Sequence, residues 1–107
     1  MQKFRKKRSR GIYVRVIKDG PAFKIYLSSE LCRTINMKPY VEFWYDDEHL
    51  VLALKDEKTA DTFSVGKPAV GDFRIVCCTS LVKHLKIPLG KYQVELNDDT
   101  ITFRYRC

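Results

Sequence analysis

Two stretches of this sequence present the same order of residue types. FKIYLSSELCRTINM runs from Phe23 to Met37, and FRIVCCTSLVKHLKI runs from Phe73 to Ile87. Each begins with apolar residues at alternate positions, which is typical of a strand with one buried face. Each then passes through serine or threonine, which favour helix N-termini, into apolar residues four apart, which share one helix face. The two stretches therefore predict a strand–helix unit that occurs twice in the chain.

The residues after the first stretch predict the end of its helix and a β-hairpin. Pro39 cannot continue a helix. In VEFWYDDEHLVLAL, apolar residues then alternate on both sides of an acidic turn at Asp46–Glu48. Two alternating runs around a short polar turn are typical of a hairpin.

The second stretch is followed by the same succession of signals. Pro88 and Gly90 end the helix, YQVEL alternates, NDD turns, and ITFRY returns as a second alternating run. Corresponding residues are fifty apart through the strand and helix, and fifty-one apart after one inserted residue near Gly90. With this spacing, we expect Phe73, Ile75 and Cys77 to form the buried face of the second strand.

Flanking segments complete a division into two repeats. IYVRVI, from Ile12 to Ile17, is rich in β-branched and aromatic residues and predicts a leading strand. TFSVGKPAVGD, from Thr62 to Asp72, predicts a shorter strand that is weakened by glycine and proline. We therefore expect an arm at 1–11, a first repeat at 12–54, a polar linker at 55–61 and a second repeat at 62–107.

The length of one repeat predicts that the two repeats share a core. A unit of about 45 residues is marginally stable alone, because it buries too little apolar surface. The two units are expected to pack face to face as one compact domain at 12–107. The predicted fold is mainly β with two short helices, formed as a pseudo-dimer within one monomeric chain.

The positive charge of the chain is concentrated in the arm. The net charge is +7, yet residues 1–11 hold six of the twenty basic residues and no acid. The remainder has fourteen bases against thirteen acids and is nearly neutral. Three interpretations of the arm stay open: it contacts phosphates, it is a localisation tag, or it is a solvated tail without a partner.

Cysteine spacing and hydropathy limit the other classes of function. The four cysteines form no CxxC pair, and His49 and His84 add no ligand spacing, so we expect free thiols and neither metal nor cofactor. No apolar run approaches the ~20 residues that cross a bilayer. A basic N-terminus without a following apolar segment is not a signal peptide. The sequence predicts a cytoplasmic protein that does not insert into membranes.

The first repeat resembles the AbrB/MazE/SpoVT family of swapped-hairpin transcription regulators. The likeness lies in GIYVRV, in the stretch from Phe23 to Met37 and in VEFWYDDEHLVL, and it covers about Gly11–Leu54. Asp72–Tyr105 matches the same pattern more weakly. The resemblance implies that the two units interleave their hairpins into a small AbrB-like barrel. It also implies the arrangement of MraZ-like proteins, which carry two such units in one chain.

The resemblance also implies which residues contact double-stranded DNA. In the family, basic residues on the first strands and at the helix start do so, and the corresponding positions here are Arg15, Lys24 and Arg33. In the second repeat, Arg74 is taken as the equivalent of Lys24 and Lys83 as the equivalent of Arg33. With the bases of the connecting turns and of the arm, the candidate set is Arg5, Lys6, Lys7, Arg8, Arg10, Arg15, Lys18, Lys24, Arg33, Lys67, Arg74 and Lys83.

The hypothesis that follows is a DNA-binding transcriptional regulator of the AbrB-like type. The alternative is a non-catalytic protein-interaction or inhibitor module, favoured by the number of aromatic residues. RNA as the ligand also stays open. An enzyme is not expected, because Cys77 or Cys78 with His84 is the only suggestion of a nucleophile and base. The aromatic residues that favour the alternative are Tyr13, Tyr26, Tyr40, Trp44 and Tyr45.

Overall fold

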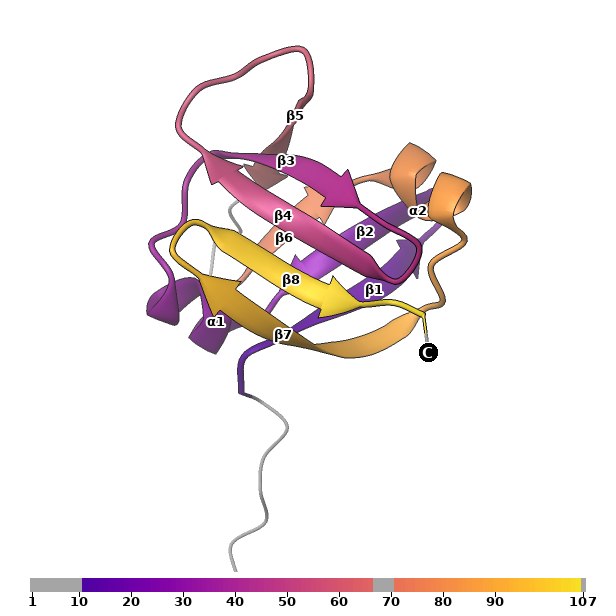
Figure 1. Cartoon of the computed structure of the whole chain (residues 1–107), viewed down its shortest axis with the longest axis horizontal. Helices are drawn as coiled ribbons and strands as arrows, with labels where there is room; N and C mark the ends of the chain where they lie inside the picture. Colours follow the sequence, from indigo (N-terminus) through magenta and orange to yellow (C-terminus); the bar gives the residue numbers. More distant parts are fainter. Residues whose placement is uncertain (1–10, 67–70, 107) are drawn as a thin grey trace, which may run out of the picture.

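The computed structural model describes residues 11–66 and 71–106, and within them the chain forms a mainly β fold with two short helices (Figure 1). This confirms the prediction of a mainly β fold with two short helices. The elements, in chain order, are β1 (Tyr13–Asp19), β2 (Ala22–Leu27), α1 (Ser29–Thr34), β3 (Tyr40–Tyr45), β4 (His49–Lys55), β5 (Thr62–Gly66), β6 (Arg74–Cys77), α2 (Thr79–Leu85), β7 (Gly90–Asn97) and β8 (Thr100–Arg104).

The strands close into a barrel. Their order around it is β1-β2-β6-β5-β3-β4-β8-β7, and β7 pairs with β1 to complete the circle. All neighbouring strands are antiparallel. The helices α1 and α2 lie at opposite ends of the barrel (Figure 1).

The strand order is the same when the first half of the chain is exchanged with the second. The hairpin β3–β4 lies beside β5, the first strand of the second half, and the hairpin β7–β8 lies beside β1, the first strand of the first half. Strands β2 and β6 pair with each other, as do β4 and β8. Every strand pairing between the two halves of the chain therefore joins strands that are distant in the sequence.

One hydrophobic core fills the barrel and draws on both halves. Its side chains come from alternate positions of the strands, because successive residues of a strand point to opposite faces. Each fully buried aliphatic side chain contributes about 1.5–3 kcal/mol relative to an exposed one. The side chains that are at most 2% exposed are Val14, Val16, Ile25, Leu27, Leu31, Val41, Leu50, Leu52, Val76, Cys78, Val82, Ile101 and Phe103.

The buried face of β6 differs from the prediction. Val76 and Cys78 are buried, whereas Cys77 is exposed and Ile75 is only half-buried. The cause is the ladder between β2 and β6, in which Val76 lies directly opposite the buried Ile25. Directly paired residues point to the same face of a sheet, so this register turns Val76 inward.

The helix N-caps Ser28 and Cys78 are fifty residues apart, as expected. The strands β2 and β6 and the two hairpins are fifty-one apart, so the spacing of fifty expected for the strand is wrong. Leu31 and Val82, also fifty-one apart, both lie in the core, one in each helix. The buried pairs Leu50 with Ile101 and Leu52 with Phe103 have the same separation. Equivalent positions in the two halves can thus be compared directly.

The two helices begin differently. Ser28 caps α1, where its Oγ accepts a hydrogen bond from the Leu31 N–H at 3.3 Å. In α2 the N-cap residue is Cys78, which makes no side-chain cap bond. Thr79 instead accepts a hydrogen bond from the Phe23 N–H at 3.0 Å, and this bond ties the start of α2 to β2.

Neither of the helices in the described part of the chain is long and apolar enough to cross a membrane.

Candidate nucleic-acid interface

The structure divides the predicted DNA-contacting residues among several places. Two of them, Arg33 and Arg74, lie at the end of the barrel that bears α1. Lys18, Lys24 and Lys83 lie at the end that bears α2. Six others fall outside the described residues: Arg5, Lys6, Lys7, Arg8, Arg10 and Lys67.

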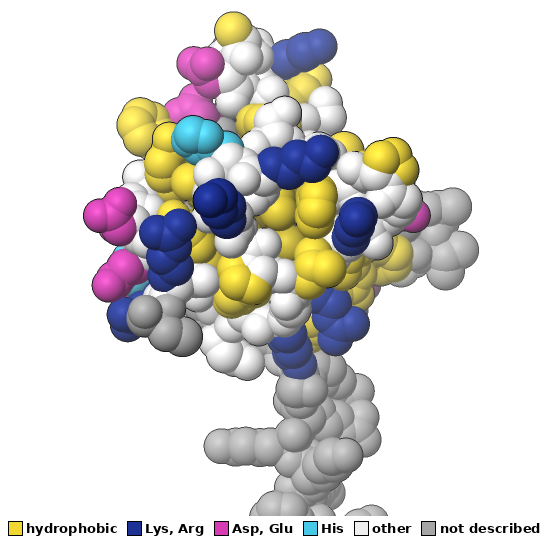
Figure 2. All heavy atoms as spheres, turned by 90° about the vertical axis from the view of Figure 1, so that its right-hand side faces the viewer, with side chains coloured by type: hydrophobic (Ala, Val, Ile, Leu, Met, Phe, Trp, Pro, Cys, Tyr) yellow, Lys and Arg dark blue, Asp and Glu magenta, His cyan; other side chains and the backbone are white. Residues whose placement is uncertain are grey.

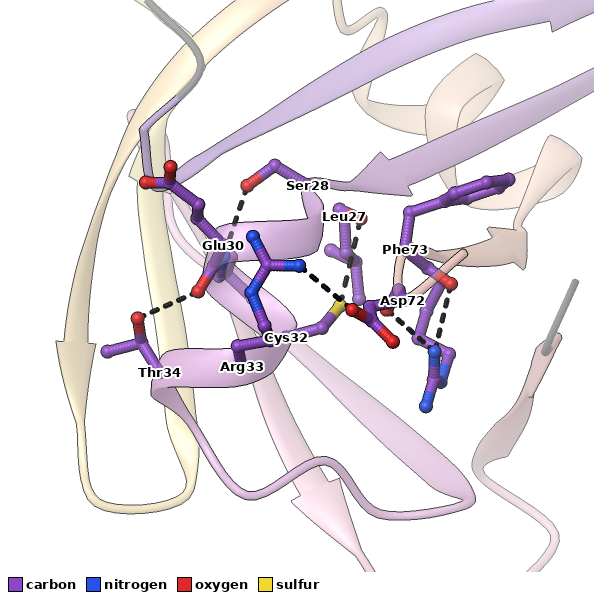
Figure 3. A network of polar contacts seen from close by, with 10 residues as sticks. Leu27, Ser28, Glu30, Cys32, Arg33, Thr34, Asp72 and Phe73 are labelled. Atoms are coloured by element: carbon purple, nitrogen blue, oxygen red, sulfur yellow. Dashed lines mark hydrogen bonds and ion pairs between the residues drawn. The ribbon is translucent and has the colours of Figure 1, made fainter. Parts of the chain in front are cut away.

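At the α1 end, two arginines are engaged by the turn that precedes β6. Arg33 Nη1 lies 2.8 Å from Asp72 Oδ2, and Figure 3 shows this side chain reaching across from the helix. Arg74 Nη1 donates to the carbonyl oxygens of Asp72 at 2.7 Å and Phe73 at 3.0 Å. The Arg33–Asp72 pair is more than half exposed on both sides, and such pairs contribute only about 0–1 kcal/mol. Arg33 can exchange Asp72 for a phosphate at little cost, whereas Arg74 serves the local backbone.

The expected equivalence of Lys24 and Arg74 is wrong. With the spacing of fifty-one in these strands, the position of Lys24 in the second half is Ile75. Arg74 is therefore a basic residue of the second half alone.

At the α2 end, a chain of contacts brings together basic residues that are distant in the sequence. Phe23 bonds to the first residue of α2, and Lys18 Nζ lies 5.7 Å from the centre of the Phe23 ring. On the other side, Arg106 Nη2 donates to the carbonyl oxygen of Leu85, the last residue of α2, at 3.5 Å. We call this surface the α2 face; its basic residues are Lys18, Lys24, Lys83, Lys86 and Arg106.

The tight turn between β1 and β2 positions two of these lysines. Gly20 adopts φ 61°, a left-handed conformation that glycine reaches without strain. The turn brings Lys24 Nζ to 2.9 Å from Asp19 Oδ2. The hydrogen bond lowers the pKa of Asp19 and raises the pKa of Lys24. Lys24 is therefore the one member of the α2 face whose charge is balanced by a described acid.

The other lysines of the α2 face lack an acidic partner within the described part of the chain. Lys18, Lys83 and Lys86 are exposed and make no ion pair with any described residue. Figure 2 looks onto this side of the barrel and shows Lys and Arg side chains spread among apolar patches, with acidic side chains mainly near the margin. Unbalanced cations on one surface attract polyanions and raise the rate of encounter with them.

Sequence reasoning missed two members of the α2 face. Lys86 follows the last helical residue and adopts φ 54°, so its backbone ends the helix in the left-handed region. Lys86 lies four residues before Gly90, a residue type that is typical of helix ends. The sequence therefore indicated that Lys86 lies near the end of the helix. Arg106 had no such signal, because its place depends on the pairing of β8 at the far end of the chain.

Arg15 occupies a third place, on the outer surface of β1. It is exposed, and its guanidinium carbon lies 5.9 Å from the centre of the Tyr13 ring. Tyr13 is followed along the surface by Tyr26 at 6.3 Å and by Phe73 at 5.1 Å from Tyr26, measured between ring centres. Burial raises the pKa of the Tyr26 hydroxyl. Two of the aromatic residues singled out in the sequence are thus packed against each other on the sheet.

Among the described residues, no hydrogen bond joins a thiol to an imidazole, and the Cys32 thiol donates to the Leu27 carbonyl oxygen. Burial raises the pKa of Cys32 to about 11 and that of Cys78 to about 12, so both are neutral near pH 7. The exposed His84 instead meets the ring of Tyr45, with ring centres 6.1 Å apart. Among residues 11–66 and 71–106, no group of three or more His, Cys, Asp or Glu side chains is placed to hold a metal ion.

Comparisons of the chain with protein-family models, with curated proteins and with solved structures find no match.

Proposed function

We propose that this chain is a DNA-binding transcriptional regulator of the AbrB-like type, and that the α2 face contacts the phosphates of duplex DNA. The observation that carries the proposal is a group of exposed lysines on one surface, Lys18, Lys83 and Lys86, that have no acidic partner among the described residues. Each phosphate that a lysine neutralises releases condensed counterions, and this release dominates affinity for nucleic acid. The arm, with six further bases, adds to the same term.

The proposal includes a swapped-hairpin pseudo-dimer within one chain. It is supported by the pairing of each hairpin with the first strand of the other half, in β1 with β7 and in β3 with β5. The agreement of the strand order under exchange of the halves supports it as well. We take the protein to be non-enzymatic and cytoplasmic, with a barrel that one chain completes.

Fluorescence anisotropy with a labelled duplex, measured across a series of salt concentrations, tests the proposal. The double variant Lys18→Ala with Lys83→Ala should bind more weakly and should lose about 1.8 from the slope of log K against log salt, since each contact contributes about 0.9. The matched control is Lys55→Ala with Lys58→Ala, which removes the same charge from exposed positions at the linker. Equal losses in both double variants, or no loss in either, would reject the α2 face as the contact surface.

A second candidate function is the protein-interaction module, and one observation favours it. Trp44 is 62% exposed and Tyr45 is 53% exposed at the end of β3. Exposed aromatic residues of this size are common anchors of protein interfaces.

A further inference from the structure

An apolar hollow opens on the barrel wall between β3, the start of β5 and α2. It is lined by Phe43, Trp44, Phe63 and Leu81, together with the carboxylates Glu42 and Asp61. We call it the Trp44 groove. The groove exists because the ladder between β3 and β5 ends at the pair of Glu42 with Thr62, so the last residues of β3 have no β5 partner beside them. Phe43 and Phe63 meet edge to face in this opening, with ring centres 4.9 Å apart.

The internal symmetry of the barrel shows that the fold does not require an apolar surface here. In the other half, the position of Trp44 is taken by Glu95. The same backbone is therefore compatible with a carboxylate at this place. An apolar patch that packing does not demand, and that includes a tryptophan 62% exposed, marks a docking surface.

The charges of the groove define its occupant. Glu42 and Asp61 form no ion pair with any described residue. Contact between two Trp44 grooves would place these carboxylates against their own copies, and like charges at an interface oppose association. The groove therefore fits a basic segment that carries an apolar anchor. Residues 1–10, MQKFRKKRSR, form such a segment: they hold six bases and no acid, with Phe4 among the bases.

We propose that residues 1–10 of one copy dock in the Trp44 groove of a second copy. Phe4 enters between Trp44 and Leu81, and the neighbouring bases pair with Glu42 and Asp61. We take a second copy as the donor because of where Gly11, the residue after the arm, lies. Its carbonyl oxygen accepts from Ser28 Oγ at 3.0 Å beside α1, whereas the groove borders α2 at the opposite end of the barrel (Figure 1).

The only tryptophan of the chain reports directly on this contact. The full chain, without DNA, is examined by sedimentation equilibrium and by tryptophan emission over a range of protein concentrations. We expect association that grows with concentration, accompanied by a blue shift of the Trp44 emission as the indole leaves water. Phe4→Ala and, separately, Leu81→Glu should each weaken association at least about tenfold, the effect of losing ~1.4 kcal/mol.

Two controls separate this contact from general stickiness or misfolding. Leu89→Glu alters another exposed apolar residue, 54% exposed and outside the groove lining, and should leave association unchanged. Glu42→Lys with Asp61→Lys should abolish association, and Arg5→Glu with Lys6→Glu in the same chain should restore it.

Three results would overturn the proposal. The first is a chain that stays monomeric with a water-exposed emission at every concentration. The second is association that Phe4→Ala leaves intact. The third is a blue shift that does not depend on concentration, since that result means that the arm folds back on its own chain. None of these results bears on the α2 face, because DNA binding is measured separately and with different variants.

Discussion

Ser28 illustrates what a single residue reveals in the sequence and what it does not. Its place before Glu30 and Leu31 predicts an N-cap, and the cap is present. The same Oγ also accepts from the Tyr13 N–H at 3.2 Å and donates to the Gly11 carbonyl oxygen. The serine is 3% exposed and joins the helix to the start of β1. The cap could be predicted because it is local, whereas the tie to β1 depends on a pairing fifteen residues away.

The buried thiol of Cys78 makes stability depend on pH in the alkaline range. Its pKa is raised from 9.0 to about 12 in the folded chain, mainly by burial. The neutral thiol is therefore favoured by the fold, and its contribution is fully present below pH 9. As the pH rises from 9 toward 12 the unfolded chain gains by ionising, so the free energy of unfolding falls.

Urea denaturation between pH 7 and pH 11 measures this effect. The wild-type midpoint should decrease above pH 9, and Cys78→Ala should lower the midpoint at pH 7 while flattening the decrease. An alkaline slope that Cys78→Ala leaves unchanged would assign the pH dependence to other groups.

Strand β6 shows why the pattern of one element can mislead. In FRIVCC one face carries Phe73, Ile75 and Cys77, and the other carries Arg74, Val76 and Cys78. Alternation alone favours burial of the first face, because the charged Arg74 lies on the second. The choice is made by the pairing with β2, which no local signal encodes. The same error carried over to the expected equivalence of Lys24 and Arg74.

The register of β6 can be tested by a pair of substitutions. Val76→Ala should reduce the free energy of unfolding by roughly 1–3 kcal/mol, because it opens a cavity in a fully buried site. Ile75→Ala should cost less, although it removes more carbon atoms, because Ile75 is only half-buried on the outer surface. Urea unfolding of both variants gives the comparison. A larger loss for Ile75→Ala would support the face that alternation from Phe73 predicts.

At the scale of the whole molecule, the sequence predicted the order of elements but not their neighbours. Two strand–helix–hairpin units and a polar linker could be predicted from periodicity and turn residues, and the described elements follow that order. The α2 face could not be assembled in this way. It joins the β1–β2 turn to α2 and to Arg106, and those contacts exist only after β2 pairs with β6 and β8 with β4. The basic residues of the α2 face thus come together only through strand pairings between distant parts of the chain, which periodicity does not predict.

The barrel topology predicts that neither half of the chain folds alone. Each half contributes strands whose partners lie in the other half, through β1 with β7, β2 with β6, β3 with β5 and β4 with β8. A single half would be reduced to two separate strand pairs, β1–β2 with β3–β4 or β5–β6 with β7–β8, each with both edges open and the core exposed, which a unit of this size cannot compensate. The linker at 55–61, in contrast, is exposed throughout and connects strands that are already held in place.

Limited trypsin digestion exploits this difference. Cleavage after Lys55 or Lys58 should leave a nicked barrel whose two fragments co-elute in gel filtration and keep the circular dichroism of the intact protein. After separation in urea, each fragment should stay unfolded on removal of the denaturant, and mixing the two should restore the β signal, because only the mixture supplies every strand with its neighbour. Fragments that part on nicking, or a single fragment that recovers a cooperative unfolding transition by itself, would show that the halves are independent units packed side by side.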